Sequence, residues 1–174
     1  LKKNKVKAIG IDPSINVGKI ANDRGLETYI GFYDKNIIRK ILKNNSKPDA
    51  IVASSVITHL ENPIEFVKNT KFFLKKEGTL IIEIEYLYNF LKNLEYERFY
   101  FDRPFYYSAN TINYMFKKFD MSLYDIEIID IHGGSLRLYI KNSKFTKMTQ
   151  RCVKILKREN LQLNIKNFKK INTK

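Results

Sequence analysis

The chain has 174 residues, 44% of them hydrophobic, which suits one ordinary packed domain, or a domain with a helical tail, and excludes a disordered protein. Its single cysteine excludes a disulfide framework or a cysteine zinc cluster within this sequence and is typical of a reducing cytoplasm; no apolar run reaches the length of a membrane span. The net charge of +14 comes from lysines scattered along the chain without a recognisable nucleic-acid-binding module, so nucleic acid is not the expected partner.

Apolar runs and amphipathic segments alternate over the first half of the chain. Short runs rich in Ile and Val are typical of strands buried in a parallel sheet, and the segments between them carry a helical apolar stripe. Strands and helices are expected in turn over residues 5–11, 15–24, 26–30, 35–43, 50–54, 63–76 and 79–84. The expected helix N-caps are Ser14, Asp34, Asn62 and Ser108. This order predicts an α/β protein with a Rossmann-like, doubly wound and mostly parallel sheet.

Residues 50–53 form the run around which the predicted sheet is organised. The run is expected to be a strand buried on both faces. Ser54 and Ser55 follow at its carboxyl end, where open α/β sheets place their ligand crevice. His59 lies in the next loop, either as a site residue or as a loop histidine held by the backbone.

Two other positions follow strands near the start of the chain. Asp12 ends the first strand, where a carboxylate can accept hydrogen bonds from both hydroxyls of a ribose. The alternative is a helix N-cap, a position that Ser14 can fill instead. Phe32 follows the second strand, and its ring either stacks on a purine or covers the core. Gly25 is expected to end the helix between these strands.

The second half of the chain departs from this alternation. Residues 96–107 hold seven aromatic side chains with neither a strand nor a helix period, so they form a loop that either plugs the core or lines a site. Residues 126–131 and 136–140 predict an antiparallel hairpin at the sheet edge, because Gly133 and Gly134 between them suit a tight turn.

A basic helix is expected from Phe145, followed by a loose lysine-rich tail over residues 161–174. The predicted domains are therefore residues 1–142 and a basic helical extension over residues 143–174.

Four motifs together resemble a known enzyme family. They are I-G-I-D-P-S at 9–14, S-S-V-I-T-H-L-E-N-P at 54–63, E-I-E-Y-L at 83–87 and I-H-G-G-S-L-R-L-Y at 131–139. The sequence resembles a class I S-adenosylmethionine-dependent methyltransferase. More narrowly, it is similar to the sugar C-methyltransferases that act on nucleotide-linked keto-hexoses. The similarity runs over residues 5–141, and its last motif is the most specific.

The resemblance implies a cofactor site and a reaction. In that family a base removes a proton next to the sugar ketone, and the resulting enolate attacks the sulfonium methyl group. Asp12 would hold the cofactor ribose, and Phe32 with Ser54 or Ser55 would lie by the adenine and the methionine part. His59 would face the sugar from the crevice loop.

The resemblance also implies catalytic and substrate-binding positions. Tyr100 and Asp102 match a tyrosine and a glutamate of the family's aromatic loop, and with His59 and Arg103 they are the expected catalytic residues. The expected contacts to a nucleotide-sugar substrate are Glu83, Tyr86, His132 and Arg137.

The aromatic loop departs from the family at one position. The family's loop ends in tyrosine, histidine, glutamate, histidine, whereas this chain has Arg103 in the place of the base histidine. Arginine stays protonated and cannot accept a proton. Either His59 or a tyrosine is then the base, or the acceptor differs and Arg103 clamps a carboxylate or phosphate, or the domain no longer catalyses.

The resemblance further predicts that this sequence is a fragment. The family's N-terminal zinc segment, its first strand with a glycine-rich loop, and its C-terminal domain have no counterpart here, so zinc is expected only in a missing segment and no metal in this chain. The missing strand would lie at the centre of the sheet, and the isolated chain is expected to bind the cofactor poorly. The rival hypothesis is a catalytically silent basic domain that binds a partner or nucleic acid. The resemblance assigns a cytoplasmic location and no oligomeric state.

Overall fold

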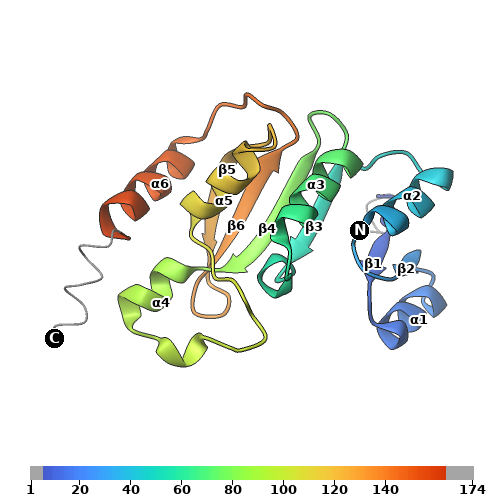
Figure 1. The fold of residues 1–174 in the computed structure, drawn as a ribbon, viewed down its shortest axis with the longest axis horizontal. Helices are drawn as coiled ribbons and strands as arrows, with labels where there is room; N and C mark the ends of the chain where they lie inside the picture. The colour runs from blue at the N-terminus through green and yellow to red at the C-terminus, as the bar shows by residue number, and fades with distance from the viewer. Residues whose placement is uncertain (1–5, 164–174) are drawn as a thin grey trace. The chain divides into compact units, whose positions relative to one another are not determined.

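The computed structural model describes residues 6–163. The chain divides into two compact units, residues 1–47 and 48–174, whose helices and strands are drawn in Figure 1. None of the helices within the described residues combines the length and the apolar character that a membrane span requires.

The first unit is a two-stranded parallel sheet with two helices. Its elements are β1 (Gly10–Asp12), α1 (Ile15–Asp23), β2 (Thr28–Ile30) and α2 (Lys35–Asn44). Asp34 caps α2 as predicted, because its carboxylate accepts the backbone N–H groups of Asn36 and Ile37 at 2.8 Å. Helix α2 buries Ile38 and Ile41, two members of its predicted apolar stripe.

Helix α1 ends at a glycine and begins after a turn that an acidic residue orders. Gly25 follows the helix with φ of +71°, a conformation that glycine adopts without strain, so the predicted end is confirmed. Ser14 occupies the predicted N-cap position, but its side chain makes no capping hydrogen bond. Instead the Ser14 backbone N–H donates to Asp12 Oδ1 at 2.8 Å, so the acidic residue orders this turn.

The second unit contains a four-stranded mixed sheet. Its strands are β3 (Ala50–Ser54), β4 (Thr79–Glu85), β5 (Ser122–Ile129) and β6 (Ser135–Lys141), in the order β3-β4-β6-β5. Strands β3 and β4 are parallel, and β6 runs antiparallel to both β4 and β5. The predicted hairpin at the sheet edge is therefore confirmed. The α-helices are α3 (Pro63–Phe73), α4 (Leu87–Asn93), α5 (Ala109–Lys117) and α6 (Gln150–Gln162), and short 3₁₀ turns cover η2 (Ile57–His59) and η3 (Tyr96–Arg98).

Helices cover one face of this sheet. Figure 1 shows α3 and α5 in front of the strands and α6 next to α5. On β4 the side chains of Leu80, Ile82 and Ile84 are buried, whereas Glu83 and Glu85 lie on the opposite face. The prediction that residues 50–53 are buried on both faces is wrong, because β3 is an edge strand of this sheet and Val52 is 68% exposed.

Two helices of the second unit also differ from the prediction. Helix α4 was not predicted. Helix α6 begins at Gln150 rather than at Phe145, because Thr149 is its N-cap and accepts the backbone N–H of Cys152 at 3.2 Å. Whether residues 143–174 form a separate extension stays a prediction, and the tail expected over 161–174 lies outside the described residues from position 164 onward.

A buried glutamate joins α6 to α5. Glu159 is 1% exposed, and its carboxylate accepts the backbone N–H groups of Ala109 and Asn110, both at 2.8 Å. These N–H groups open α5 and have no partner within the helix, so the carboxylate satisfies them and also interacts favourably with the helix dipole. The side chain of Asn110 adds a third hydrogen bond to Glu159 at 2.8 Å.

Replacing Glu159 with Gln should lower the free energy of unfolding by about 2 kcal/mol, because the amide brings a donor and no charge to N–H groups that need an acceptor. Chemical denaturation followed by circular dichroism measures the change. Lys157→Ala, at an exposed position of the same helix, should change stability by less than about 0.5 kcal/mol. Equal effects of the two substitutions would contradict the capping role.

A second link joins the start of α6 to β5. Arg151 donates from Nε to Asp125 Oδ1 at 2.6 Å, and the Thr149 hydroxyl donates to the same oxygen at 2.5 Å. These hydrogen bonds, that of Arg151 first, lower the pKa of Asp125 to about 2 despite its burial. The folded protein thus holds this carboxylate ionised at a pH where the unfolded chain would protonate it.

Asp125→Asn should destabilise the protein by about 1–2 kcal/mol at neutral pH. A pKa that is lower in the folded state contributes stability above the ordinary value of the carboxyl group and loses it as the pH falls. The difference between wild type and variant should therefore shrink as the pH falls from about 4 to about 2. Denaturation curves across this range measure it, with Asp130→Asn, an exposed position just after β5, as the control. A difference that does not change with pH would rule out the ion pair as its cause.

Candidate functional site

Asp12 and Phe32 lie at the same end of the first unit. Asp12 ends β1 and stands opposite Ile30, the last residue of the parallel strand β2. The Gly31 N–H donates to the Asp12 carbonyl at 2.9 Å, which fixes the start of the segment that carries Phe32, a side chain 74% exposed.

These two side chains fit a nucleoside in chemical terms. Asp12 Oδ1 accepts the Ser14 N–H, and no described residue pairs with Oδ2, so one carboxylate oxygen is open to a hydroxyl group. The exposed ring of Phe32 can stack on a base. The groups needed to hold a ribose and an adenine are therefore present within the first unit.

Ser54 and Ser55 end β3 in the second unit. The Ser54 hydroxyl donates to Glu83 Oε2 at 3.1 Å, and the Ser55 N–H donates to the Glu83 carbonyl at 2.9 Å. Ser55 has φ of +54°, so the chain turns sharply away from the sheet immediately after the strand. His59 follows this turn in η2.

A row of polar side chains crosses the open face of the sheet. Ser54, Glu83, Arg137 and Glu127 stand opposite one another, one on each of the four strands. Arg137 donates from Nε to Glu83 Oε1 at 2.6 Å and lies 3.5 Å from Glu127 through Nη1. The structure therefore brings together three residues that the sequence assigned to cofactor or substrate, and both carboxylate oxygens of Glu83 already have partners.

The four predicted catalytic residues form one cluster in the second unit. His59 Nδ1 lies 3.1 Å from the backbone carbonyl oxygen of Asp102 and 3.7 Å from its carboxylate. The guanidinium carbon of Arg103 lies 5.1 Å from the centre of the Tyr100 ring. The cluster thus joins the loop after β3 to the aromatic loop, although some forty residues separate His59 from Asp102.

Glu85 completes this cluster and was given no role by the sequence. Its Oε2 lies 2.5 Å from Arg103 Nη1 and its Oε1 lies 3.7 Å from Arg98 Nη2. The close contact with Glu85 is the largest cause of a raised pKa of Arg103, so this arginine stays charged. The sequence feature that could have identified Glu85 is the alternation of side chains along β4, which places Glu85 on the same face as Glu83, at the carboxyl end of the strand.

His132 and Tyr86 occupy very different surroundings. The His132 side chain is exposed in the hairpin turn, and its backbone carbonyl accepts a hydrogen bond from Arg98. The adjacent Gly133 has φ of +70°, a left-handed conformation that a residue with a side chain would adopt only with strain. Tyr86 is 0% exposed, burial raises its pKa, and its hydroxyl lies 3.5 Å from Arg158. Its assignment to substrate stays a prediction that its burial does not support.

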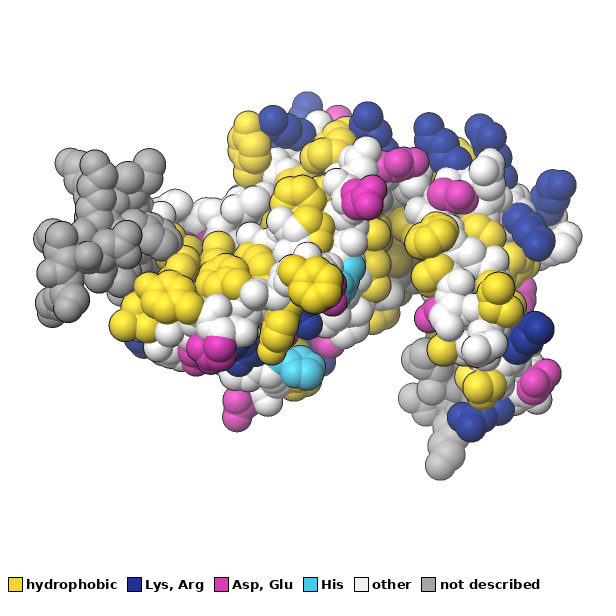
Figure 2. All heavy atoms as spheres, turned by 60° about the horizontal axis from the view of Figure 1, so that its bottom comes forward, with side chains coloured by type: hydrophobic (Ala, Val, Ile, Leu, Met, Phe, Trp, Pro, Cys, Tyr) yellow, Lys and Arg dark blue, Asp and Glu magenta, His cyan; other side chains and the backbone are white. Residues whose placement is uncertain are grey.

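Hydrophobic side chains gather on the surface near the predicted catalytic cluster. Figure 2 shows exposed hydrophobic groups close to the histidines of the second unit. The large exposed apolar side chains of this region are Leu94, Tyr96, Phe99, Tyr100, Phe101 and Phe105. The aromatic loop therefore does not only plug the core but also offers rings to solvent.

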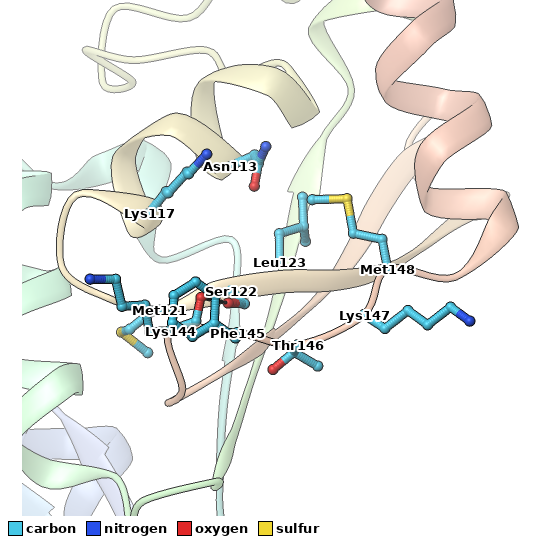
Figure 3. Close-up of a pocket in the computed structure, with 10 residues that line it drawn as sticks. All are labelled: Asn113, Lys117, Met121, Ser122, Leu123, Lys144, Phe145, Thr146, Lys147 and Met148. Atoms are coloured by element: carbon cyan, nitrogen blue, oxygen red, sulfur yellow. Dashed lines mark hydrogen bonds between the residues drawn. The ribbon is translucent and has the colours of Figure 1, made fainter.

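A pocket of about 460 Å³ lies elsewhere in the second unit. Figure 3 shows Asn113 and Lys117 of α5 on one side of it and residues 144–148 on the other. Its floor includes Ser122, which pairs with Lys141 at the end of the sheet opposite to Glu85. None of the predicted site residues lines this pocket.

Comparison with known proteins identifies the family. Residues 1–126 match a family model described as a methyltransferase domain. The C-methyltransferase NovU of Streptomyces niveus is 23% identical over 133 residues, which are 76% of this chain and 32% of NovU. The chain therefore spans about a third of the length of this curated relative.

Solved methyltransferase structures share the fold. A structure of the complex between the Trm112 methyltransferase activator of Haloferax volcanii and a methyltransferase has a TM-score of 0.61 and 15% identity, over 79% of this chain and 72% of that one. A magnesium protoporphyrin IX methyltransferase of Synechocystis with bound S-adenosylhomocysteine has a TM-score of 0.58 and 12% identity, over 78% and 64%. A methyltransferase of Thermotoga maritima has a TM-score of 0.57 and 20% identity, over 82% and 75%. The predicted Rossmann-like α/β fold is confirmed.

Proposed function

We propose that this chain, which belongs to the class I S-adenosylmethionine-dependent methyltransferase family, takes part in methyl transfer to a carbon of a nucleotide-linked keto-deoxysugar. Methyl transfer follows from the family, and the likeness to a C-methyltransferase supports a carbon acceptor. The observation that carries the proposal is the hydrogen bond between His59 and the Asp102 carbonyl, because it leaves one imidazole nitrogen free to act as a base.

The cofactor supplies, when bound, a methyl group on a positively charged sulfur. Asp12 is proposed to accept hydrogen bonds from the ribose hydroxyls through its open oxygen, and Phe32 to lie against the adenine. Ser54 and Ser55 are proposed to serve the methionine part from the end of β3.

His59 is the proposed general base. A backbone carbonyl only accepts hydrogen bonds, so the neutral ring must carry its proton on Nδ1, 3.1 Å from the Asp102 oxygen. Nε2 then holds a lone pair and takes the proton from the carbon next to the sugar ketone. The electron pair left on that carbon would then form the bond to the methyl group that the cofactor supplies, while the bond from this methyl group to sulfur would break.

The neighbouring groups suit the charges that develop in this step. The Asp102 carboxylate, 3.7 Å from His59 Nδ1, stabilises the imidazolium that forms when Nε2 is protonated. Tyr100, half exposed beside Arg103, is proposed to donate a hydrogen bond from its hydroxyl to the ketone oxygen as negative charge develops there. Glu83, His132 and Arg137 remain the proposed contacts to the nucleotide sugar.

Arg103 is proposed to be neither the base nor a clamp for an acidic acceptor. It cannot accept a proton, and its charge is already opposed by Glu85 at 2.5 Å. This pairing favours the keto-sugar over an acidic acceptor, because a carboxylate or phosphate would have to displace Glu85 from Arg103.

Asp12→Ala should weaken the binding of S-adenosylhomocysteine about tenfold or more, because a hydrogen bond to a charged group contributes about 1.5–3 kcal/mol. Isothermal calorimetry on the protein that contains this chain measures the affinity. Asp23→Asn, an exposed acid at the end of α1, is the matched control and should leave the affinity unchanged. Unchanged affinity in the Asp12 variant would remove the proposed ribose contact.

His59→Asn should lower the rate of methyl transfer about 10²–10⁴-fold, because the amide can still donate to the Asp102 carbonyl but cannot act as the base. The same variant should fail to catalyse exchange of the sugar's acidic hydrogen with deuterated water, a readout that separates proton removal from methyl transfer. Glu61→Gln, an exposed position two residues away, controls for local charge. Exchange at the wild-type rate in His59→Asn would mean that another group is the base.

A further inference from the structure

Glu85 is the point at which the aromatic loop is tied to the sheet. It is the last residue of β4, and its side chain is 11% exposed. One carboxylate oxygen faces Arg103 at 2.5 Å and the other faces Arg98 at 3.7 Å. Both arginines belong to the loop over residues 96–107, so a single carboxylate at a strand end holds this loop at two places.

The two arginines have different tasks in the loop. Arg98 also lies 3.4 Å from Glu95 and donates to the His132 carbonyl, so it joins the start of the loop to the hairpin turn. Among the described residues, Arg103 forms its ion pair with Glu85, and it contacts the Tyr100 ring. Loss of Glu85 would leave Arg98 with a second carboxylate but Arg103 with no nearby ion pair among the described residues.

One peptide group connects Arg103 to the carbonyl that His59 contacts. The carbonyl that accepts from His59 belongs to Asp102 and is bonded directly to the backbone nitrogen of Arg103. That nitrogen donates to the Tyr100 carbonyl at 3.2 Å. The carbonyl and the N–H of a trans peptide group point in opposite directions, so a peptide plane whose N–H faces Tyr100 must direct its carbonyl to the other side, toward His59.

We propose that Glu85 is a positioning residue that, through Arg103, fixes the peptide plane between Asp102 and Arg103 and thereby keeps the proton of neutral His59 on Nδ1. The consequence is that Nε2 stays unprotonated and available. The inference deepens the proposed function, because it rests on the assignment of His59 as the base. It also assigns a task to Arg103, which stands where the family has a histidine: a permanently charged side chain can hold a loop that a neutral imidazole would hold less firmly.

The first test reads the tautomer of His59 directly by nitrogen-15 nuclear magnetic resonance. The chain has two histidines, so His132→Asn leaves a single imidazole signal, and asparagine tolerates the positive φ of +52° at that position. In this background the neutral ring is expected to carry its proton on Nδ1. Free imidazole side chains favour Nε2, so a neutral His59 with its proton on Nε2 would overturn the proposal.

Adding Glu85→Gln to this background should shift the His59 equilibrium toward the Nε2 proton by about fivefold, the effect of losing one ordinary hydrogen bond. Glu95→Gln is the matched control, since it removes the other carboxylate that Arg98 contacts and leaves Glu85 and Arg103 paired. An unchanged tautomer in Glu85→Gln, or an equal shift in both variants, would refute the positioning role.

A charge-retaining variant keeps the test valid if Glu85→Gln fails to fold. Arg103→Lys keeps the positive charge but replaces the three-nitrogen guanidinium group with a single amine on a shorter side chain, which weakens the ion pair with Glu85. This variant should fold and give a smaller shift of the His59 tautomer in the same direction. If His59 had the same tautomer in Arg103→Lys as in the protein that keeps Arg103, that result would also count against the proposal. Dispersed amide signals show in each case that the variant is folded.

Kinetics separate this inference from the proposed function. Glu85→Gln should lower kcat for methyl transfer with little change in KM for the cofactor, because the base and not the nucleoside contacts is disturbed. A wild-type protein that shows the Nδ1 tautomer yet transfers no methyl group to a keto-sugar would refute the proposed function and leave the positioning role intact. A tautomer shift in Glu85→Gln without any change in kcat would instead refute the assignment of His59 as the base.

Discussion

The parallel pairing of β3 with β4 is the constraint on which the candidate site of the second unit depends. The register places Ser54 opposite Glu83, so both strands end at the same edge of the sheet. The loop that carries His59 therefore leaves the sheet next to Glu85. A slip of one residue would turn the two glutamates of β4 toward the face where Leu80 and Ile82 are buried, and burying two charges there would be strongly unfavourable. The hydrophobic alternation of β4 thus also fixes the position of its charged groups.

Apolar patterns and capping residues over short stretches of sequence were enough to predict most of the helices and strands and several of their ends. Asp34, Asn62 and Ser108 cap helices as expected, because an N-cap depends on hydrogen bonds within a few residues. The exposure of Val52 was not predictable in this way, since a short apolar run reads the same at the centre and at the edge of a sheet. The start of α6 was misplaced for a similar reason, because periodicity shows that a helix exists more clearly than where it begins.

The candidate site was predictable in part and for a different reason. The resemblance pointed to His59, Asp102 and Arg103 as members of one site, and the structure brings these three together. Glu85 was missed because its importance depends on a pairing with Arg103, eighteen residues further along the chain and beyond both α4 and η3. Tyr86 is the opposite case: it matched the family by spacing, but a residue directly after a strand can turn inward as well as outward, and this one turns into the core, so its assignment to substrate stays a prediction.

Under the proposed function, the arginine at position 103 changes which residue of the cluster transfers the proton. A histidine in that place can exchange a proton with a substrate, whereas a guanidinium group remains charged and is best used to bind a carboxylate. Glu85 supplies that carboxylate at 2.5 Å, so the charge of Arg103 is used within the protein. The proposed reaction therefore assigns proton transfer to His59, the only other histidine of the chain being His132 in the hairpin turn. The hydrogen bond between His59 and the Asp102 carbonyl is consistent with this proposed role, because it occupies Nδ1 and leaves Nε2 to accept a proton.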